Sequence, residues 1–136
     1  MLDCLILGDS LAVGVGQIRK ECVTYAKSGI NSYDYVSRDM LHIKGNTSAK
    51  TVVISLGSND TAKVNTLEEL VSLRQLINAD RVYWILPNIK EHKRQAVLAV
   101  AEKYKDFVID ARQHDTSQDQ VHPTYKGYKS ISEKTK

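Results

Sequence analysis

Short apolar runs alternate with helical patterns along this chain, and that alternation constrains its fold more than any other feature. The runs are rich in Val, Ile, Tyr and Phe, and most are apolar on successive residues. This pattern favours strands that are buried on both faces of a sheet, as in a parallel sheet. The runs lie at residues 2–7, 22–26, 51–56, 81–86 and 106–109.

Helical patterns fill the intervals between these runs. The clearest begins at Thr66, where Thr66 and Glu69 have the spacing of a capping box and leucines then recur at helical intervals as far as Leu76. Further helices are expected over about residues 91–104, more weakly over 32–43, and in a short form over 125–132.

Five strands alternating with helices in 136 residues predict a single α/β domain over residues 1–136. We expect a minimal three-layer α/β/α sandwich around a five-stranded parallel sheet. Right-handed crossovers leave few topologies, and the flavodoxin-like strand order 2-1-3-4-5 is the leading candidate. In such a sheet an active site lies outside the carboxyl ends of the strands.

Composition and charge exclude several classes of partner. A net charge of +3, without a basic stripe interleaved with aromatic residues, gives no reason to expect nucleic-acid binding. No apolar run approaches the roughly 18 residues that span a bilayer. Too few residues precede Gly8 for a signal peptide, so a cytoplasmic protein is expected. The oligomeric state stays open.

Cys4 and Cys22 are the only cysteines, and both lie in apolar, strand-like segments. The favoured interpretation is two buried thiols that behave as small hydrophobic side chains. A disulfide between neighbouring strands is the alternative, disfavoured because such bonds are rare in the cytosol.

Glycine, serine, asparagine and histidine follow the predicted strands. These residues fall in segments 8–10, 27–31, 57–60, 87–89 and 110–123. Because parallel strands end at the same edge of a sheet, we expect these segments to converge there. The sequence therefore predicts a polar site built from several loops.

Ser10 is the candidate nucleophile, and a serine hydroxyl needs a base within hydrogen-bond reach. Among the four histidines, His122 is the favoured base because Pro123 restricts its backbone just before the last helix. Asp119 lies three residues earlier and could orient the imidazole and stabilise its charged form.

An acyl-transfer site also needs donors for the developing oxyanion. The backbone N–H groups of Ser10 and Gly29 and the side-chain amide of Asn59 are the candidates. Asp9 and Asp60 are expected to support the site. No metal ligands or cofactor are predicted.

Each of these short patterns has an ordinary structural explanation when taken alone. Gly8-Asp9-Ser10 and the segment 57–60 both have the composition of turns. His114 and Asp115 could replace His122 and Asp119, although no proline holds them. The functional interpretation depends on their joint occurrence at strand ends.

Taken together, the motifs resemble those of the SGNH hydrolase (GDSL esterase/lipase) family. The residues that carry the resemblance are Gly8-Asp9-Ser10-Leu11, Gly29, Gly57-Ser58-Asn59-Asp60 and Asp119-Gln120-Val121-His122. The resemblance implies a Ser10–His122–Asp119 triad and an oxyanion hole from Ser10, Gly29 and Asn59. It also implies hydrolysis of an ester or thioester through an acyl-enzyme, without a metal or cofactor.

The chain is short for that family, and its brief loops provide no apolar lid. An open site suits acetyl or short acyl esters, including esters of carbohydrates. The alternatives are a catalytically silent binding domain of the same fold, or a thioesterase or lysophospholipase. A flavin-binding or receiver-type domain is disfavoured, because strand three ends in Leu56-Gly57 rather than in an aspartate.

Overall fold

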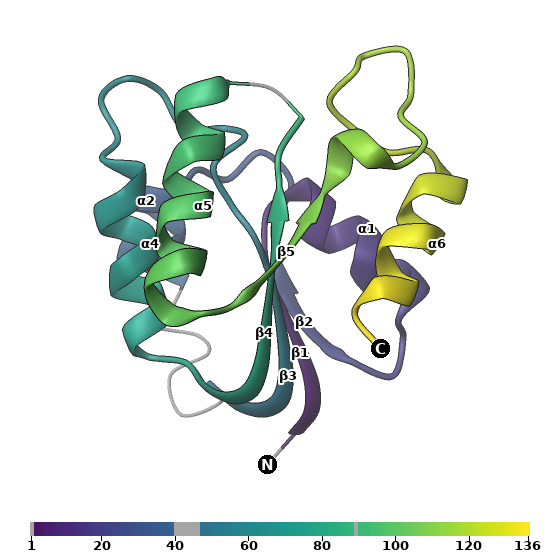
Figure 1. The fold of residues 1–136 in the computed structure, drawn as a ribbon, viewed down its shortest axis with the longest axis horizontal. Helices are drawn as coiled ribbons and strands as arrows, with labels where there is room; N and C mark the ends of the chain where they lie inside the picture. The colour runs from purple at the N-terminus through teal and green to yellow at the C-terminus, as the bar shows by residue number, and fades with distance from the viewer. Residues whose placement is uncertain (1, 40–46, 89) are drawn as a thin grey trace.

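The computed structural model describes residues 2–39, 47–88 and 90–136. Five parallel strands form one sheet in the order β2-β1-β3-β4-β5, which confirms the predicted topology (Figure 1). The strands are β1 (Leu2–Gly8), β2 (Val23–Ala26), β3 (Ser48–Ser55), β4 (Asn78–Leu86) and β5 (Phe107–Asp110). The strand order reverses between β1 and β3, the place where ligands bind in open α/β sheets.

Helices cover both faces of the sheet and make a three-layer sandwich (Figure 1). On one face lie α1 (Ser10–Ile18) and α6 (Tyr125–Lys134). The other face carries α2 (Ser32–Asp34), the π-helical turn η1 (Tyr35–Asp39), α4 (Thr66–Gln75) and α5 (Glu91–Tyr104). A 3-10 turn, η2 (Ala111–Gln113), follows β5. The predicted fold class is therefore confirmed.

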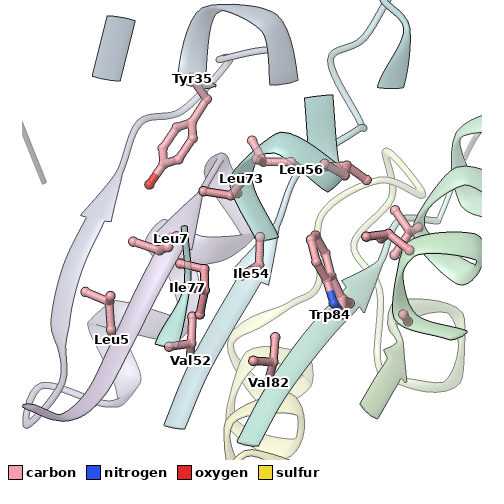
Figure 2. Close-up of a cluster of buried hydrophobic side chains, with 14 of the residues drawn as sticks. Leu5, Leu7, Tyr35, Val52, Ile54, Leu56, Leu73, Ile77, Val82 and Trp84 are labelled. Atoms are coloured by element: carbon pink, nitrogen blue, oxygen red, sulfur yellow. The ribbon is translucent and has the colours of Figure 1, made fainter. Parts of the chain in front are cut away.

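Alternate residues of the strands point into two apolar cores, one on each face of the sheet. Leu5 and Leu7 of β1 point toward the α4/α5 side, where they share a core with Trp84 (Figure 2). Cys4 and Ile6 point to the α1/α6 side. Trp84 is fully buried, and its Nε1 donates to Asp106 over 2.9 Å. Trp84 therefore belongs to the core and not to a substrate cleft.

Helix α1 was not predicted from the sequence. Gly14 and Gly16 lower its intrinsic helix propensity, yet both are required by close packing. A Cβ on Gly14 would come within 2.3 Å of the Tyr128 ring, and one on Gly16 within 2.5 Å of the Thr24 hydroxyl. Close packing against α6 and β2 therefore requires glycine at these two positions, and the glycines weaken the helical pattern in the sequence.

Two helix predictions need correction. The segment expected to be helical over 32–43 contains only α2 followed by η1, and residues 40–43, including His42, lie outside the described part. Helix α4 begins at Thr66 as predicted, but its N-cap is Asn65, whose side chain accepts from the Glu68 N–H over 3.2 Å. The Thr66 hydroxyl instead donates to Asp60.

The interpretation of Cys4 and Cys22 as free thiols is wrong. The structure joins them in a disulfide, with their Cα atoms 4.8 Å apart. Pairing of β1 with β2 aligns Leu5 with Val23 and so places the two cysteines beside each other at the start of the paired segment. The bond closes a loop that runs from Cys4 through the rest of β1 and α1 to the turn before β2.

Within the three described ranges, no helix is both long and apolar enough to cross a membrane.

Candidate active site

Ser10 is placed by a sharp turn at the end of β1. Gly8 has φ +136°, and a Cβ there would lie 1.8 Å from the Ser55 carbonyl oxygen, so only glycine fits against β3. The Asp9 N–H donates to that carbonyl over 2.9 Å. Ser10 then becomes the first residue of α1, at the carboxyl edge of the sheet.

Asp9 is the N-cap of α1 and is completely buried. One carboxylate oxygen, Oδ1, accepts from the Leu11 N–H over 3.2 Å and from the Ser55 hydroxyl over 2.8 Å. The other, Oδ2, has no hydrogen-bond partner among the described residues. Burial therefore raises the pKa of Asp9 to about 7, against the lowering effect of these hydrogen bonds.

His122 reaches Ser10 from the opposite end of the chain. The distance from Ser10 Oγ to His122 Nε2 is 2.9 Å, and His122 Nδ1 lies 2.7 Å from Asp119 Oδ2. The structure thus brings the three sequence-predicted residues into one hydrogen-bonded chain. The imidazole faces the serine with one ring nitrogen and the carboxylate with the other.

The Asp119 carboxylate is held by several donors. Its Oδ1 accepts from the backbone N–H groups of Val121 and His122, both over 2.9 Å, and from the Ser117 hydroxyl over 2.8 Å. The hydrogen bond from the His122 ring, followed by these others, holds the pKa of Asp119 well below its usual range. Asp119 therefore stays ionised at neutral pH.

The alternative pair from the same loop lies elsewhere. His114 Nδ1 is hydrogen-bonded to the Ser130 hydroxyl of α6 over 2.5 Å, and Asp115 accepts from the Thr124 hydroxyl over 2.7 Å. Neither residue is bonded to Ser10. The geometry favours His122 and Asp119 over His114 and Asp115.

Contacts that the sequence did not predict support the His122 loop. Asn88, which follows β4, donates from its side-chain amide to the Val121 carbonyl over 3.2 Å. The loop is closed at its base by an isolated antiparallel bridge between Thr116 and Pro123. Asn88 lies at a strand's carboxyl end, and that position was the only available signal in the sequence.

The loops after β2 and β3 are tied together beside Ser10. Asn59 donates from Nδ2 to the Ile30 carbonyl over 3.0 Å. The buried Asp60 accepts from the Ser32 N–H over 2.7 Å and from the Thr66 hydroxyl over 2.6 Å. Asp60 thus holds the Gly29 and Asn59 segments in place relative to each other.

A hollow of about 470 Å³ connects these groups. It is lined by Ser10, Val13, Gly14, Gln17, Ser28, Gly29, Asn59, His122 and Tyr128. Within the described residues, the N–H groups of Ser10 and Gly29 make no hydrogen bond. The Asn59 amide makes one, to the Ile30 carbonyl, which leaves its second N–H without an acceptor. The serine, the imidazole and three potential oxyanion donors therefore border one space.

Other features of the surface lack this combination. A wider hollow of about 650 Å³ lies between the start of α4 and α5, but its lining contains no paired nucleophile and base. In the described segments, no three His, Cys, Asp or Glu side chains converge as metal ligands would. The chemistry that the structure offers is thus concentrated around Ser10.

No family model and no curated protein sequence matches this chain. Solved structures do match. A Bacillus subtilis protein superposes with a TM-score of 0.72 at 18% identity, over 98% of this chain and 54% of that one. This chain therefore spans about half the length of that protein.

Two further structures match along nearly their whole length. One, described as a lipolytic protein of the G-D-S-L family from Desulfitobacterium hafniense, has a TM-score of 0.66 at 17% identity, over 98% of this chain and 97% of that one. The fold is that of the SGNH hydrolases. A carbohydrate acetylesterase family member from Sinorhizobium meliloti has a TM-score of 0.65 at 12% identity, over 96% of this chain and 94% of that one.

In this SGNH hydrolase fold, the segment after β1 and the segment before α6 meet at the carboxyl edge of the sheet. The segment that contains Ser10 follows β1, and the segment 119–122 precedes α6, which packs against α1. The packing of α1 against α6 therefore fixes the distance between Ser10 and His122.

Proposed function

We propose that this protein hydrolyses carboxylic esters through an acyl-enzyme formed on Ser10. The observation that carries the proposal is the continuous hydrogen-bonded chain from Ser10 Oγ through His122 to Asp119, at 2.9 and 2.7 Å. This arrangement, with the base oriented by a third group, is the signature of an activated serine.

In the proposed reaction, Ser10 Oγ attacks the ester carbonyl carbon while His122 Nε2 takes its proton. The carbonyl oxygen becomes an oxyanion, which the N–H groups of Ser10 and Gly29 and the Asn59 amide stabilise. When the tetrahedral intermediate collapses, the carbon–oxygen bond to the alcohol breaks and His122 returns the proton to the leaving alcohol. A water molecule, deprotonated by His122, then releases the acid from Ser10 by the same route.

Asp119 serves this cycle by orientation and charge. Its Oδ2 accepts from Nδ1 of His122, which leaves Nε2 free to accept the serine proton. Because its pKa is well below the usual range, the carboxylate stays negative when the imidazole becomes positive. The ion pair formed at that moment stabilises the transition state.

For the substrate we propose acetyl or other short acyl esters, with a polar alcohol such as a carbohydrate. The 470 Å³ hollow is open to solvent, and the Tyr128 ring fills the space over Gly14. A second hollow of about 200 Å³ shares Ser28 and Gly29 with it and is lined by Lys27, Asp34, Arg38 and Asp39. Such charged and polar groups suit hydroxyl-bearing alcohols, and a fold neighbour is a carbohydrate acetylesterase.

The proposal is tested by hydrolysis of a panel of 4-nitrophenyl esters from acetyl to octanoyl, and of acetylated sugars. We expect turnover that is fastest for the acetyl ester and lost in Ser10→Ala. Ser130→Ala is the matched control, because it removes the hydroxyl of the other serine–histidine pair and should remain active. Faster turnover of the octanoyl ester would contradict the substrate class. Absence of any turnover by the wild type would favour a silent binding domain.

A further inference from the structure

Lys90 contacts the segment that carries Asn59 and plays no part in the steps above. It lies just before α5, and its Nζ donates to the carbonyl oxygens of Ser58 over 2.8 Å and of Asp60 over 3.1 Å. These two carbonyls belong to the residues on either side of Asn59. One ammonium group therefore bridges the backbone across the amide assigned to the oxyanion hole.

The backbone of this segment is already a tight turn. The Asp60 N–H donates to the Gly57 carbonyl over 3.1 Å, which closes a four-residue turn with Ser58 and Asn59 at its centre. The Asp60 side chain anchors one side of the turn to Ser32. Lys90 holds the carbonyl groups of the same turn from the side of α5.

The backbone conformation of Lys90 is unusual for a residue with a side chain. Its φ is +61°, in the left-handed region that non-glycine residues seldom adopt. The Lys90 carbonyl nevertheless accepts from the Lys93 and Arg94 N–H groups over 2.8 and 3.1 Å, which begins α5. The surrounding contacts therefore maintain a strained residue at the point from which its Nζ reaches the turn.

A hydrogen bond to a charged donor is stronger than a neutral one, and carbonyls that share one ammonium group cannot move apart freely. The position of Asn59 Nδ2 matters most when negative charge develops on the substrate, because oxyanion donors act chiefly in the transition state. A shift of the turn would lower kcat more than it would change substrate binding.

We propose that Lys90 is a positioning residue for the oxyanion hole, which it serves by clamping the Ser58 and Asp60 carbonyls around Asn59. The inference rests on the proposed ester hydrolase. Lys90 does not line the 470 Å³ hollow and is hydrogen-bonded to neither Ser10 nor His122, so it acts on turnover through the turn that carries Asn59.

Three lysine variants test the clamp through steady-state kinetics on the acetyl ester. Lys90→Met removes the ammonium group and keeps the apolar part of the side chain; kcat should fall about tenfold, with KM changed less than twofold. Lys90→Arg keeps a charged donor and should retain most of the activity. Lys105→Met is the matched control, because Lys105 also has positive φ, +57°, at the other end of α5.

A double-mutant cycle separates positioning from a general effect on stability. In an Asn59→Ala background, Lys90→Met should cause no further loss of kcat, because the group that it positions is gone. Equal losses in both backgrounds would overturn the proposal, as would a Lys90→Met variant with wild-type kcat. If that variant is fully active while Ser10→Ala is inactive, the clamp fails and the ester hydrolase stands. A wild type without turnover would overturn both.

Discussion

Ser10 Oγ and His122 Nε2 lie 2.9 Å apart although 112 positions separate them in the chain. The turn at Gly8 delivers the serine to the carboxyl edge of the sheet, and the packing of α6 on α1 brings the histidine to the same edge. The strands between β1 and β5 also contribute, because they hold the loops that carry Ser10 and His122 at the same edge of the sheet.

Removal of the proposed base should abolish most of the activity. We expect His122→Ala to lower kcat by roughly three to four orders of magnitude or more, as for other serine triads. His114→Ala is the matched control: it also breaks a serine–histidine hydrogen bond, to Ser130, but lies outside the proposed site. Steady-state kinetics on the acetyl ester measure both variants. A small loss in His122→Ala with a large one in His114→Ala would reverse the assignment.

Asp119→Asn should keep the loop folded and still impair catalysis. The amide oxygen can accept from the Val121 and His122 N–H groups as the carboxylate does, but it carries no charge to stabilise the imidazolium. We expect kcat to fall by about 10² to 10⁴ with little change in KM.

The pH dependence of the wild type follows from the lowered pKa of Asp119. A carboxylate with a lowered pKa loses its charge only when the pH falls below the usual aspartate range. Between pH 5 and 9 the charge of Asp119 therefore stays constant, so protonation of this carboxylate should not limit activity anywhere in that range. NMR of the Asp119 carboxyl carbon tests this, and a titration step between pH 5 and 9 would contradict it.

Asp9 should make the protein less stable as the pH rises. Its pKa is raised from 3.8 to about 7, so folding favours the neutral acid. Below pH 3.8 the group is neutral in both states and costs nothing. From there to about pH 7 the unfolded chain ionises while the folded protein does not, so the penalty grows and then stays constant.

Asp9→Asn removes this dependence, because an amide does not ionise and can still cap α1 through its oxygen. When the pH is raised from 5 to 8, the melting temperature of the wild type should fall more than that of the variant. Asp80→Asn, at an exposed position of β4, controls for the lost charge. Identical pH profiles for wild type and Asp9→Asn would contradict the account.

Reduction of the Cys4–Cys22 bond should destabilise the fold. The bond joins residues 18 positions apart, and loops of about this length gain roughly 3 kcal/mol from loop closure in the chain-entropy description. Urea unfolding with and without reductant measures the difference. Free-thiol titration of the denatured, unreduced protein should find no free thiol, and two thiols would show that the bond is absent.

The disulfide is also in tension with the expected cytoplasmic location, because such bonds persist mainly in oxidising compartments. The location therefore stays a prediction.

The sequence carried enough information to predict the sheet. Buried parallel strands are apolar on successive residues, so β1 and β3 are recognisable without their partners. For β4 the prediction covers residues 81–86 of a strand that begins at Asn78. The strand-end rule then places Ser10, Asn59 and His122 at one edge of that sheet. The structure brings all three around one hollow.

What escaped prediction depends on contacts between distant residues. Gly14 and Gly16 weaken the helical pattern of α1 in the sequence. These glycines are needed because Tyr128 and Thr24 pack closely against them, and those contacts form only in the folded protein. The cysteines looked like ordinary core residues, since their pairing depends on the register of β1 with β2.

The role proposed for Lys90 could not be predicted from the sequence either. Its hydrogen bonds to the Ser58 and Asp60 carbonyls form only when the start of α5 packs beside the turn that follows β3.

Covalent labelling tests most directly whether Ser10 is an activated nucleophile. The protein is incubated with a fluorophosphonate, and its intact mass and the modified peptide are determined by mass spectrometry. We expect one phosphonyl group, on Ser10. This label should be absent from Ser10→Ala, and its formation should be strongly slowed in His122→Ala but not in His114→Ala. A wild-type protein that stays unlabelled, or that is labelled on Ser130 instead, would contradict this expectation.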